Sequence, residues 1–264
     1  MSTEHMPTIR VLEVLSVLAA ENTGISLTQL AGKTGILKGT LYPILKTLAE
    51  RRYINYDENT QLYFLGIACS ILSRSFFEKS YWLKMVHREM NNIVNECNEV
   101  CQMGILDGPD VLYIDKVQSA QKVQLISNIG TRLPAVYSAL GKAMICHYSD
   151  DDILRLYPDG FTPLTKYSIT TIAELRQQLE EVKIHHYATD NREINEETRC
   201  YAVSLRQRNK IIAAISISVP TFRSNDEKNS EIISVLLSSR ERIEQELNTL
   251  QDVEFYQQVE YRTF

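Results

Sequence analysis

Basic side chains gather in one short stretch near the start of the chain, between residues 28 and 53. The stretch holds five basic residues and a single acid, Glu50, and so carries a local charge of +4 in a chain of formal net charge −5. The basic residues are Lys33, Lys38, Lys46, Arg51 and Arg52. Binding to nucleic-acid phosphates is largely electrostatic and needs such a local excess of positive charge. The stretch therefore predicts a DNA-binding surface; the alternative is a solvated helical face.

The segment "KGTLYPILKTL", residues 38–48, opens a helical pattern with small, hydroxyl and basic side chains. The N-terminal end of a recognition helix enters the major groove, where Thr40 and Tyr42 can hydrogen-bond to base edges or phosphates. Lys38 can reach either of these, and Gly39 permits close approach of the backbone. The predicted DNA-contacting residues are Ser26, Thr28, Lys38, Gly39, Thr40, Tyr42, Lys46, Arg51 and Arg52.

A second group of residues lies in the C-terminal half. Residues 138–141 form the first turn of a predicted helix, and their backbone N–H groups can bind a carboxylate. Together with Asp190 and Cys200, this turn can line a pocket for a small polar ligand. On the residues alone, an aspartate such as Asp190 is more often a turn residue, and a cysteine such as Cys200 is more often a core residue.

Enzyme signatures are missing from the sequence. We find no P-loop, GxGxxG, GxSxG or HExxH motif, and none of the five histidines stands at a spacing that would activate a nucleophile. No cofactor is expected. Two alternatives stay open: an enzyme that uses Asp190 and Cys200 and has an N-terminal dimerisation module, and a winged-helix module that binds protein and not DNA.

The number of cysteines and the hydropathy pattern predict the cellular compartment of the protein. The five cysteines are odd in number in a long chain, which favours a reduced, cytoplasmic setting over a disulfide framework. No nearby cysteine or histidine pair completes a zinc site. The first twenty residues show no leader pattern, and no uninterrupted apolar run of about 18 residues predicts a membrane span.

Helical periodicity and turn residues organise the N-terminal part. Residues 8–20 predict a first helix, and Ser26 is a candidate N-cap of a short second helix. A third helix is expected from Gly39 or Thr40 to about Arg51, with Thr40 as its N-cap. This start would place Pro43 in the first turn, where proline costs little. Residues 53–66 predict a β-hairpin, which completes the order of a winged helix-turn-helix.

The remaining pattern predicts a linker and a second domain. Residues 67–99 are expected to form one long or once-broken helix. Beyond residue 100, we expect strands in 100–119, 122–127 and 200–220, and helices in 135–148, 151–157, 171–187 and 226–250. The fold class is therefore α+β, with an antiparallel sheet covered by helices. The expected domains are a winged helix-turn-helix (1–66), a linker helix (67–99), an effector-binding domain (100–250) and a C-terminal tail (251–264). The aromatic tail can either dock or remain loose.

Three motifs in the same order resemble the IclR family of bacterial transcription regulators. "LAERRYINYDENTQLYFLG" resembles the end of the family's recognition helix and its wing, and "GTRLPAVYSALGKA" resembles its G-x-R-x-P…GKA segment. "YATDNREINEETRCYAVSL" resembles its Y-x-x-D-x-x-E…C-x-A stretch. The resemblance covers roughly residues 7–250.

The resemblance implies a dimer or tetramer that binds double-stranded operator DNA, most often as the repressor of a catabolic operon. The C-terminal domain, GAF-like in fold, would bind a small organic acid, a sugar acid or an aromatic metabolite. From the hydropathy pattern and the ligand count given above, no membrane partner and no metal are expected. With the small first turn described above, the implied effector pocket comprises Leu125, Leu133, Ser138, Ala139, Leu140, Asp190, Thr198 and Cys200.

Two positions depart from the family pattern. Pro43 stands where the family usually has a basic residue, and "GTLYPILKTLAERRYI" is instead similar to the recognition helix of PadR-type regulators, whose C-terminal half does not fit this chain. Glu197 stands where the family has a glycine ahead of its cysteine, which adds a charge beside the expected pocket.

Overall fold

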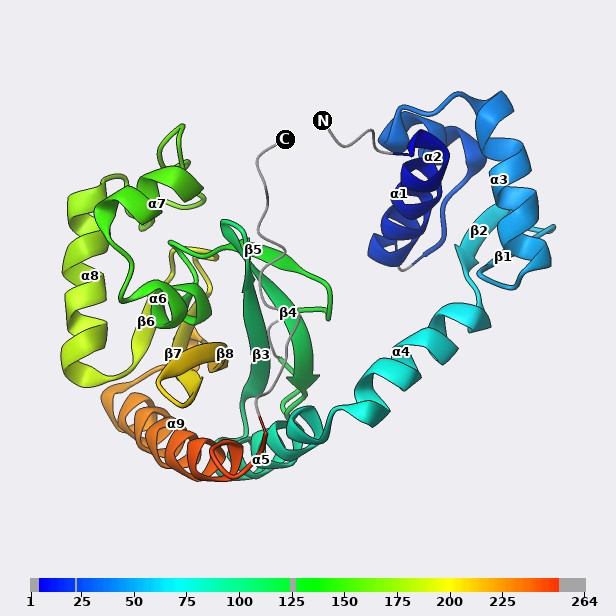
Figure 1. Ribbon diagram of the computed structural model, residues 1–264. Helices are drawn as coiled ribbons and strands as arrows, with labels where there is room; N and C mark the ends of the chain where they lie inside the picture. Colours follow the sequence, from blue (N-terminus) through cyan, green and yellow to red (C-terminus); the bar gives the residue numbers. More distant parts are fainter. Residues whose placement is uncertain (1–4, 22, 124–126, 252–264) are drawn as a thin grey trace. The chain divides into compact units, whose positions relative to one another are not determined.

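The computed structural model describes residues 5–21, 23–123 and 127–251 (Figure 1). The chain divides into two compact units, one extending to Tyr81 and the other beginning at Trp82. Within the described ranges, no helix has both the length and the apolar character needed to cross a membrane.

The N-terminal unit begins with three helices and a hairpin. These are α1 (Met6–Ala20), α2 (Leu27–Thr34), α3 (Lys38–Glu50), β1 (Ile54–Asp57) and β2 (Leu62–Leu65). As predicted, Ser26 caps α2: its hydroxyl oxygen accepts the Gln29 N–H at 3.3 Å, and the Gln29 side chain in turn accepts the Ser26 N–H at 3.0 Å. Gly35 ends α2 in the left-handed conformation. The predicted winged helix-turn-helix order is confirmed.

The start of α3 differs from the prediction. The N-cap is Leu37 and not Thr40, because the Leu37 carbonyl already accepts the N–H groups of Thr40 (2.9 Å) and Leu41 (3.0 Å). Pro43 is therefore inside the helix. An interior proline removes one backbone hydrogen bond and costs roughly 3 kcal/mol. The helix persists because its other face is anchored in the core through the buried side chains of Leu41, Leu45 and Leu48.

A small apolar core holds this unit together. It joins α1, α2, α3 and the hairpin through Val14, Leu18, Ile25, Leu30, Ile36, Leu41, Leu45, Leu48 and Ile54. The segment before α2 also pairs with the hairpin, since Ile25 and Tyr63 exchange backbone hydrogen bonds of 3.0 and 2.9 Å. Helix α3 is thus fixed against the β1–β2 hairpin, the predicted wing.

Two helices occupy the segment expected to be one long or once-broken helix. They are α4 (Ile67–Lys79) and α5 (Tyr81–Cys97), and Ser80 interrupts the helical run between them. The division between the compact units falls directly after this break, so α4 belongs to the first unit and nearly all of α5 to the second.

An antiparallel sheet of six strands forms the centre of the second unit, in the order β5-β4-β3-β8-β7-β6. The strands are β3 (Val100–Asp107), β4 (Asp110–Val117), β5 (Arg132–Pro134), β6 (Ala188–Asn191), β7 (Thr198–Gln207) and β8 (Lys210–Pro220). The helices that follow α5 are α6 (Ala139–Ile145), α7 (Asp150–Leu156), α8 (Ile172–His185), the 3-10 turn η1 (Thr221–Arg223) and α9 (Asp226–Leu247). The α+β class is confirmed.

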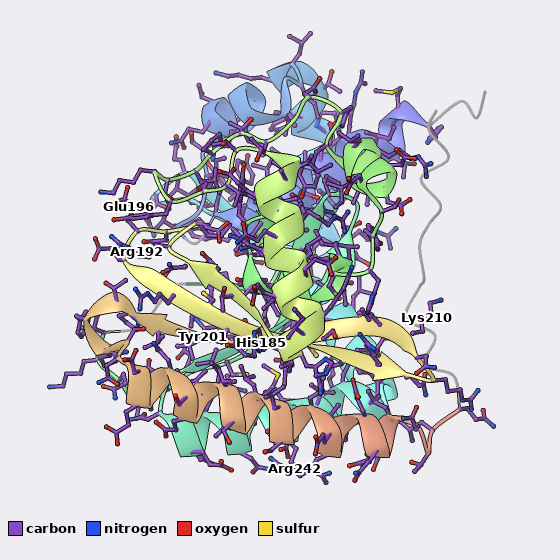
Figure 2. The ribbon with its side chains drawn as sticks, turned by 90° about the vertical axis from the view of Figure 1, so that its left-hand side faces the viewer. His185, Arg192, Glu196, Tyr201, Lys210 and Arg242 are labelled. Atoms are coloured by element: carbon purple, nitrogen blue, oxygen red, sulfur yellow. The ribbon has the colours of Figure 1, made fainter. Side chains whose placement is uncertain are left out.

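Helices cover the sheet on both faces (Figure 1). On one face α5 and α9 lie together, joined by the pair between Arg242 and Glu89 and by the Arg88–Glu246 pair of 3.2 Å. Figure 2 shows α9, which carries Arg242, running below the strands, with α8 on the other side of the sheet. On that other face α6 packs between the sheet and α8, with every residue of α6 buried.

Several smaller expectations were wrong or lie outside the described residues. The helix expected over 135–148 is only Ala139–Ile145, and the edge strands β5 and β6 were not predicted. Of the strand expected at 122–127, residues 122 and 123 are a bend, and residues 124–126 lie outside the described part. The aromatic tail beyond residue 251 also lies outside it.

Candidate functional site

The exposed face of α3 carries most of the predicted DNA-contacting residues. Lys38, Gly39, Tyr42 and Lys46 are exposed, and Thr40 is half-buried. The Lys38 amine donates a 2.8 Å hydrogen bond to the hydroxyl of Thr28, which is also exposed, and so connects the starts of α2 and α3. These side chains therefore share one surface of the helix-turn-helix.

The remaining predicted DNA-contacting residues, Ser26, Arg51 and Arg52, lie at the ends of helices. The Ser26 hydroxyl is engaged in the cap of α2. Arg51 and Arg52 are exposed where α3 ends, and Arg52 has a left-handed backbone with φ of 62°. The Arg52 carbonyl accepts the Ala68 N–H at 3.0 Å, which places the two arginines where the hairpin and α4 meet.

The charge of this surface is smaller than the sequence count suggests. Lys33 forms an ion pair with Glu21, which lies outside the counted stretch. The wing also contributes no positive charge, since residues 53–66 contain Asp57 and Glu58 and no lysine or arginine. Asp57 shapes the hairpin tip by accepting the Asn59 N–H (2.9 Å) and the Thr60 hydroxyl (2.8 Å), and these hydrogen bonds lower its pKa. The free positive charge among the predicted DNA-contacting residues therefore lies on α3 and at its ends.

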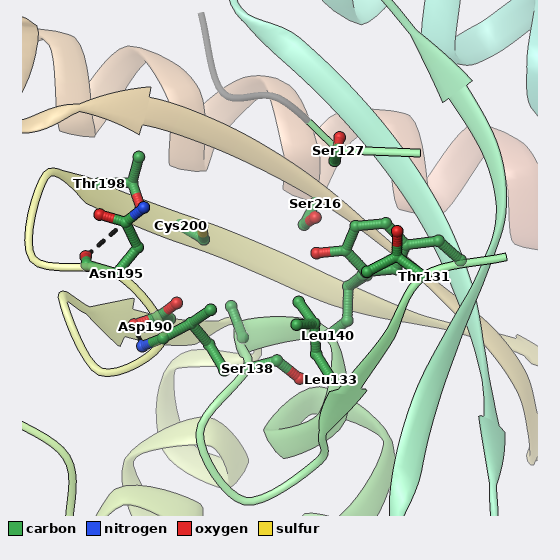
Figure 3. Close-up of a pocket in the computed structure, with 13 residues that line it drawn as sticks. Ser127, Thr131, Leu133, Ser138, Leu140, Asp190, Asn195, Thr198, Cys200 and Ser216 are labelled. Atoms are coloured by element: carbon green, nitrogen blue, oxygen red, sulfur yellow. Dashed lines mark hydrogen bonds between the residues drawn. The ribbon is translucent and has the colours of Figure 1, made fainter. Parts of the chain in front are cut away.

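The second unit contains a cavity of about 180 Å³ on the α6 side of the sheet (Figure 3). Strands β4, β5, β6, β7 and β8 and the start of α6 all contribute to its wall. The lining residues are Tyr113, Ser127, Thr131, Leu133, Ser138, Ala139, Leu140, Asp190, Ile194, Asn195, Thr198, Cys200 and Ser216.

The cavity brings together residues that are far apart in the sequence. Seven of the eight residues proposed for the effector pocket line it: Leu133, Ser138, Ala139, Leu140, Asp190, Thr198 and Cys200. The eighth, Leu125, lies outside the described residues. Sequence reasoning missed Tyr113, Ser127, Thr131, Ile194, Asn195 and Ser216. The run "AISIS" held a signal, because Ser216 and Ser218 alternate with buried isoleucines and so share one face of a central strand.

Asp190 is the one carboxylic acid among the described residues that line the cavity. It is 2% exposed, and one carboxylate oxygen accepts the backbone N–H groups of Glu193 (2.6 Å) and Ile194 (3.4 Å). Burial raises the pKa of Asp190 to about 7, against the opposing effect of the nearby Lys142. At neutral pH, a large share of the molecules therefore carries a proton on Asp190, which can be donated to a ligand oxygen.

The thiol of Cys200 does not have the lowered pKa of an activated nucleophile. Its sulfur lies 3.2 Å from the Ser218 hydroxyl oxygen, and burial together with the charge of Asp190 raises the pKa of the thiol. A nucleophilic cysteine needs a lowered pKa. The geometry therefore gives no support to the alternative of an enzyme that uses Asp190 and Cys200.

A buried ion pair supports the wall that carries Asp190. Lys142 and Glu193 have 1% and 3% of their side-chain surfaces exposed, and their charged atoms are 2.5 Å apart. The Lys142 amine also donates to the Thr189 carbonyl at 2.9 Å. Glu193 lies in the bend that follows β6, between the lining residues Asp190 and Ile194, so this pair fixes the segment that carries both of them.

A layer of hydrogen bonds lies beneath the opposite wall. The Gln102 side chain is fully buried and donates to the Ser127 hydroxyl at 3.2 Å. Its carbonyl oxygen accepts hydrogen bonds from Ser216 (3.3 Å) and Ser218 (3.1 Å). The hydroxyl groups at this wall are thus held in fixed positions.

The first turn of α6 is less open than the sequence suggested. The Gly141 N–H donates to the Ser138 hydroxyl at 3.0 Å, and the Ser138 N–H donates to the Pro134 carbonyl at 3.2 Å. The N–H groups of Ala139 and Leu140 remain as candidates for a ligand, since first-turn N–H groups have no partner within a helix. Gly141 is required at its position, because a Cβ there would overlap the backbone of Ala135.

The described residues contain no arrangement that suggests metal chemistry. Within them, no group of three or more histidine, cysteine or acidic side chains is placed to hold an ion. All five cysteines are free.

The fold and the two sites together define a winged helix-turn-helix regulator with a separate ligand-binding domain. The model of the family "Bacterial transcriptional regulator IclR C-terminal" matches residues 80–245, and that of the "IclR helix-turn-helix domain" matches residues 8–58. The chain belongs to the IclR family of bacterial transcriptional regulators. It is accordingly a transcriptional regulator, with a DNA-binding N-terminal domain and an effector-binding C-terminal domain.

Individual relatives agree with this assignment. The chain is 27% identical to the HTH-type transcriptional regulator KdgR of Escherichia coli over 237 residues, which cover 88% of this chain and 90% of KdgR. It is 25% identical to the transcriptional repressor IclR of Escherichia coli, covering 89% of this chain and 87% of that protein. Both relatives are transcriptional regulators.

A solved structure has the same fold. An IclR homolog from Microbacterium hydrocarbonoxydans, complexed with 4-hydroxybenzoate, superposes with a TM-score of 0.79 at 17% identity, covering 92% of this chain and all of that one.

Proposed function

We propose that this regulator is a repressor of a catabolic operon and that it acts in the cytoplasm as a homodimer or homotetramer. Residues 1–66 would bind the operator, residues 67–99 would set the spacing of two such modules, and residues 100–250 would bind the effector. Similarity to the repressor IclR supports the sign of regulation. The observation that carries the proposal is the cavity lined by Asp190, Thr198 and Cys200, in a chain that also presents a basic recognition helix.

On the DNA side, the start of α3 would enter the major groove. The proposed contacts are Ser26, Thr28, Lys38, Gly39, Thr40, Tyr42, Lys46, Arg51 and Arg52. Exposure of Lys38 and Lys46 beside Tyr42 supports base and phosphate contacts by this face. The engaged Ser26 hydroxyl supports a positioning role for that residue, since its cap fixes the start of α2.

On the effector side, the proposed ligand is a small carboxylate such as a sugar acid or an aromatic acid. Its binding residues would be Leu125, Leu133, Ser138, Ala139, Leu140, Asp190, Thr198 and Cys200. Among the described lining residues there is no lysine or arginine. The carboxylate would therefore be held by hydroxyl and N–H donors and by the proton on Asp190. Effector affinity should then rise as pH falls through about 7, because deprotonated Asp190 repels the ligand.

A ligand changes operator affinity only if it binds one arrangement of the protein more tightly than another. The proposed effector would stabilise the arrangement in which the two DNA-binding modules do not match the spacing of the operator half-sites. Because the effector would bind that arrangement more tightly, its binding would release the repressor from the operator.

Gel shifts with the native upstream DNA test the DNA-binding assignment. Wild type should give a salt-sensitive shift that the Lys38→Ala, Thr40→Ala double variant weakens strongly. Lys122→Ala is a suitable control, because Lys122 is an exposed lysine of the other unit. A shift that the double variant leaves unchanged would refute the proposed recognition surface.

Thermal unfolding with gluconate, pyruvate and 4-hydroxybenzoate tests the effector assignment. A ligand present at about 100 times its Kd stabilises the folded state by about 2.7 kcal/mol, which corresponds to a Tm shift of roughly 5–10 °C. Thr198→Val, which removes one hydroxyl from the cavity wall, should reduce this shift. Thr189→Val makes the same change on an exposed strand position and should not. Equal losses in both variants would place the ligand elsewhere.

A further inference from the structure

The side chain of Leu37, at the start of the recognition helix, is exposed. Its exposed fraction is 79%, and no large apolar side chain of the described residues is more exposed. The preceding residue, Ile36, supplies the core contact here with 8% exposure. Leu37 is the N-cap of α3, but its side chain makes no capping hydrogen bond. Neither packing nor helix capping accounts for a leucine at this position.

The surroundings of Leu37 are those of a nucleic-acid contact. Lys38 and Gly39 follow it directly and are exposed, and a Cβ on Gly39 would meet no atom within 4 Å. Tyr42, one turn further, is 61% exposed. The start of α3 thus presents an apolar side chain beside a positive charge and an uncovered stretch of backbone. This positive charge is complementary to DNA phosphates, so the partner that fits this surface is a DNA duplex.

In the major groove, the exposed apolar feature of a base pair is the C5-methyl group of thymine. The first residues of a recognition helix are those that reach base edges. We infer that Leu37 contacts a thymine methyl and so selects thymine at the operator position facing the start of α3. This inference rests on the proposed DNA binding by α3 and adds a specificity determinant to it.

The inference is tested on a duplex selected from a random library by the full-length protein. Each thymine of the selected site is replaced in turn by uracil, which removes only the methyl group and keeps base pairing. At one thymine in each half-site, wild type should lose about fourfold in affinity, the effect of one buried methyl group. Replacements at the other thymines should change affinity less.

Leu37→Ala identifies the side chain responsible. This variant should bind the thymine and uracil duplexes equally at the sensitive position, while its folding is unaffected because Leu37 is exposed. The matched control is Leu164→Ala, since Leu164 is a half-exposed leucine of the second unit (50%). The control should retain the full sensitivity to uracil.

Each outcome has a separate meaning. If the protein selects no sequence, DNA recognition itself fails, and the inference falls with the proposed function. If it selects a site at which no thymine-to-uracil change weakens binding, only the inference is overturned. The same holds if Leu37→Ala keeps the sensitivity of wild type, because another residue would then contact the methyl group.

Discussion

At the scale of single residues, Asp190 couples stability to pH. Burial raises the pKa of Asp190 from its ordinary value near 4 to about 7, so the folded state keeps a proton that the unfolded state has already released. The free energy of unfolding should therefore fall as pH rises from about 4 to about 7, by up to about 4 kcal/mol. Asp190→Asn should flatten this dependence, because asparagine imitates the protonated acid and can still accept the Glu193 N–H. Urea unfolding between pH 5 and pH 8 measures the effect.

Asp151→Asn is the control for this experiment, because Asp151 is an exposed acid on α7. It should keep the pH profile of wild type. A profile for Asp190→Asn that matches wild type would show that Asp190 does not hold the proton.

The Lys142–Glu193 pair should be sensitive to the loss of one partner. Both side chains are almost completely buried, so Lys142→Met leaves the Glu193 carboxylate without its counter-charge. We expect a loss of about 3–5 kcal/mol in the free energy of unfolding. Lys183→Met removes a more exposed pair, that of Lys183 with Glu180, and should cost less than about 1 kcal/mol. Chemical denaturation of both variants provides the comparison, and similar costs would contradict the special role of the buried pair.

At the scale of elements, the wing is the part of the DNA-binding unit with unfavourable charge. Glu58 is exposed at its tip beside Asp57. If the wing lies along the phosphate backbone, Glu58→Lys removes a repulsion and adds a phosphate contact. We then expect affinity to increase about tenfold at low salt, with a salt dependence steeper by about one phosphate contact.

The control for the wing is Glu241→Lys, which makes the same charge change on an exposed position of α9. Gel shifts or fluorescence anisotropy over a series of salt concentrations measure both variants. Equal effects would mean that the wing does not approach DNA and that only the net charge of the protein matters.

Sequence reasoning succeeded for elements with a strong period and failed for short or irregular ones. The helices α1, α8 and α9 and the long strands β7 and β8 follow clear patterns and were predicted. The edge strands β5 and β6, of three and four residues, are too short to show a period. Pro43 favours a helix start at Gly39 or Thr40, but α3 begins at Lys38, because burial of Leu41 and Leu45 maintains the helix around the proline.

At the scale of the whole molecule, the proposed regulation requires reciprocal coupling. If an effector lowers operator affinity by some factor, the operator must lower effector affinity by the same factor. The effector found by thermal unfolding should therefore bind more weakly to the protein–operator complex than to the free protein. Calorimetric titration with and without a saturating operator duplex measures both affinities. Equal affinities would show that the cavity ligand does not control DNA binding.

The candidate pocket could be located from the sequence only in part. Leu133 was found because it stands in a motif that resembles a known family, whereas Asp190 and Cys200 were candidates from their residue types and were strengthened by that resemblance. Tyr113 and Ser216 come from strands without such a motif, and only the pairing of β4 with β3 and of β3 with β8 brings them to the same wall. The raised pKa of Asp190 likewise depends on burial, which spacing in the sequence does not reveal.

The junction after Ser80 has one further property. Trp82, the second residue of α5 after the interruption at Ser80, is the chain's single tryptophan and is 6% exposed. Indole emission from the unmodified protein thus originates from one known place, where the two compact units meet in the sequence. Spectroscopists can follow this junction during titration with operator or metabolite without attaching any dye.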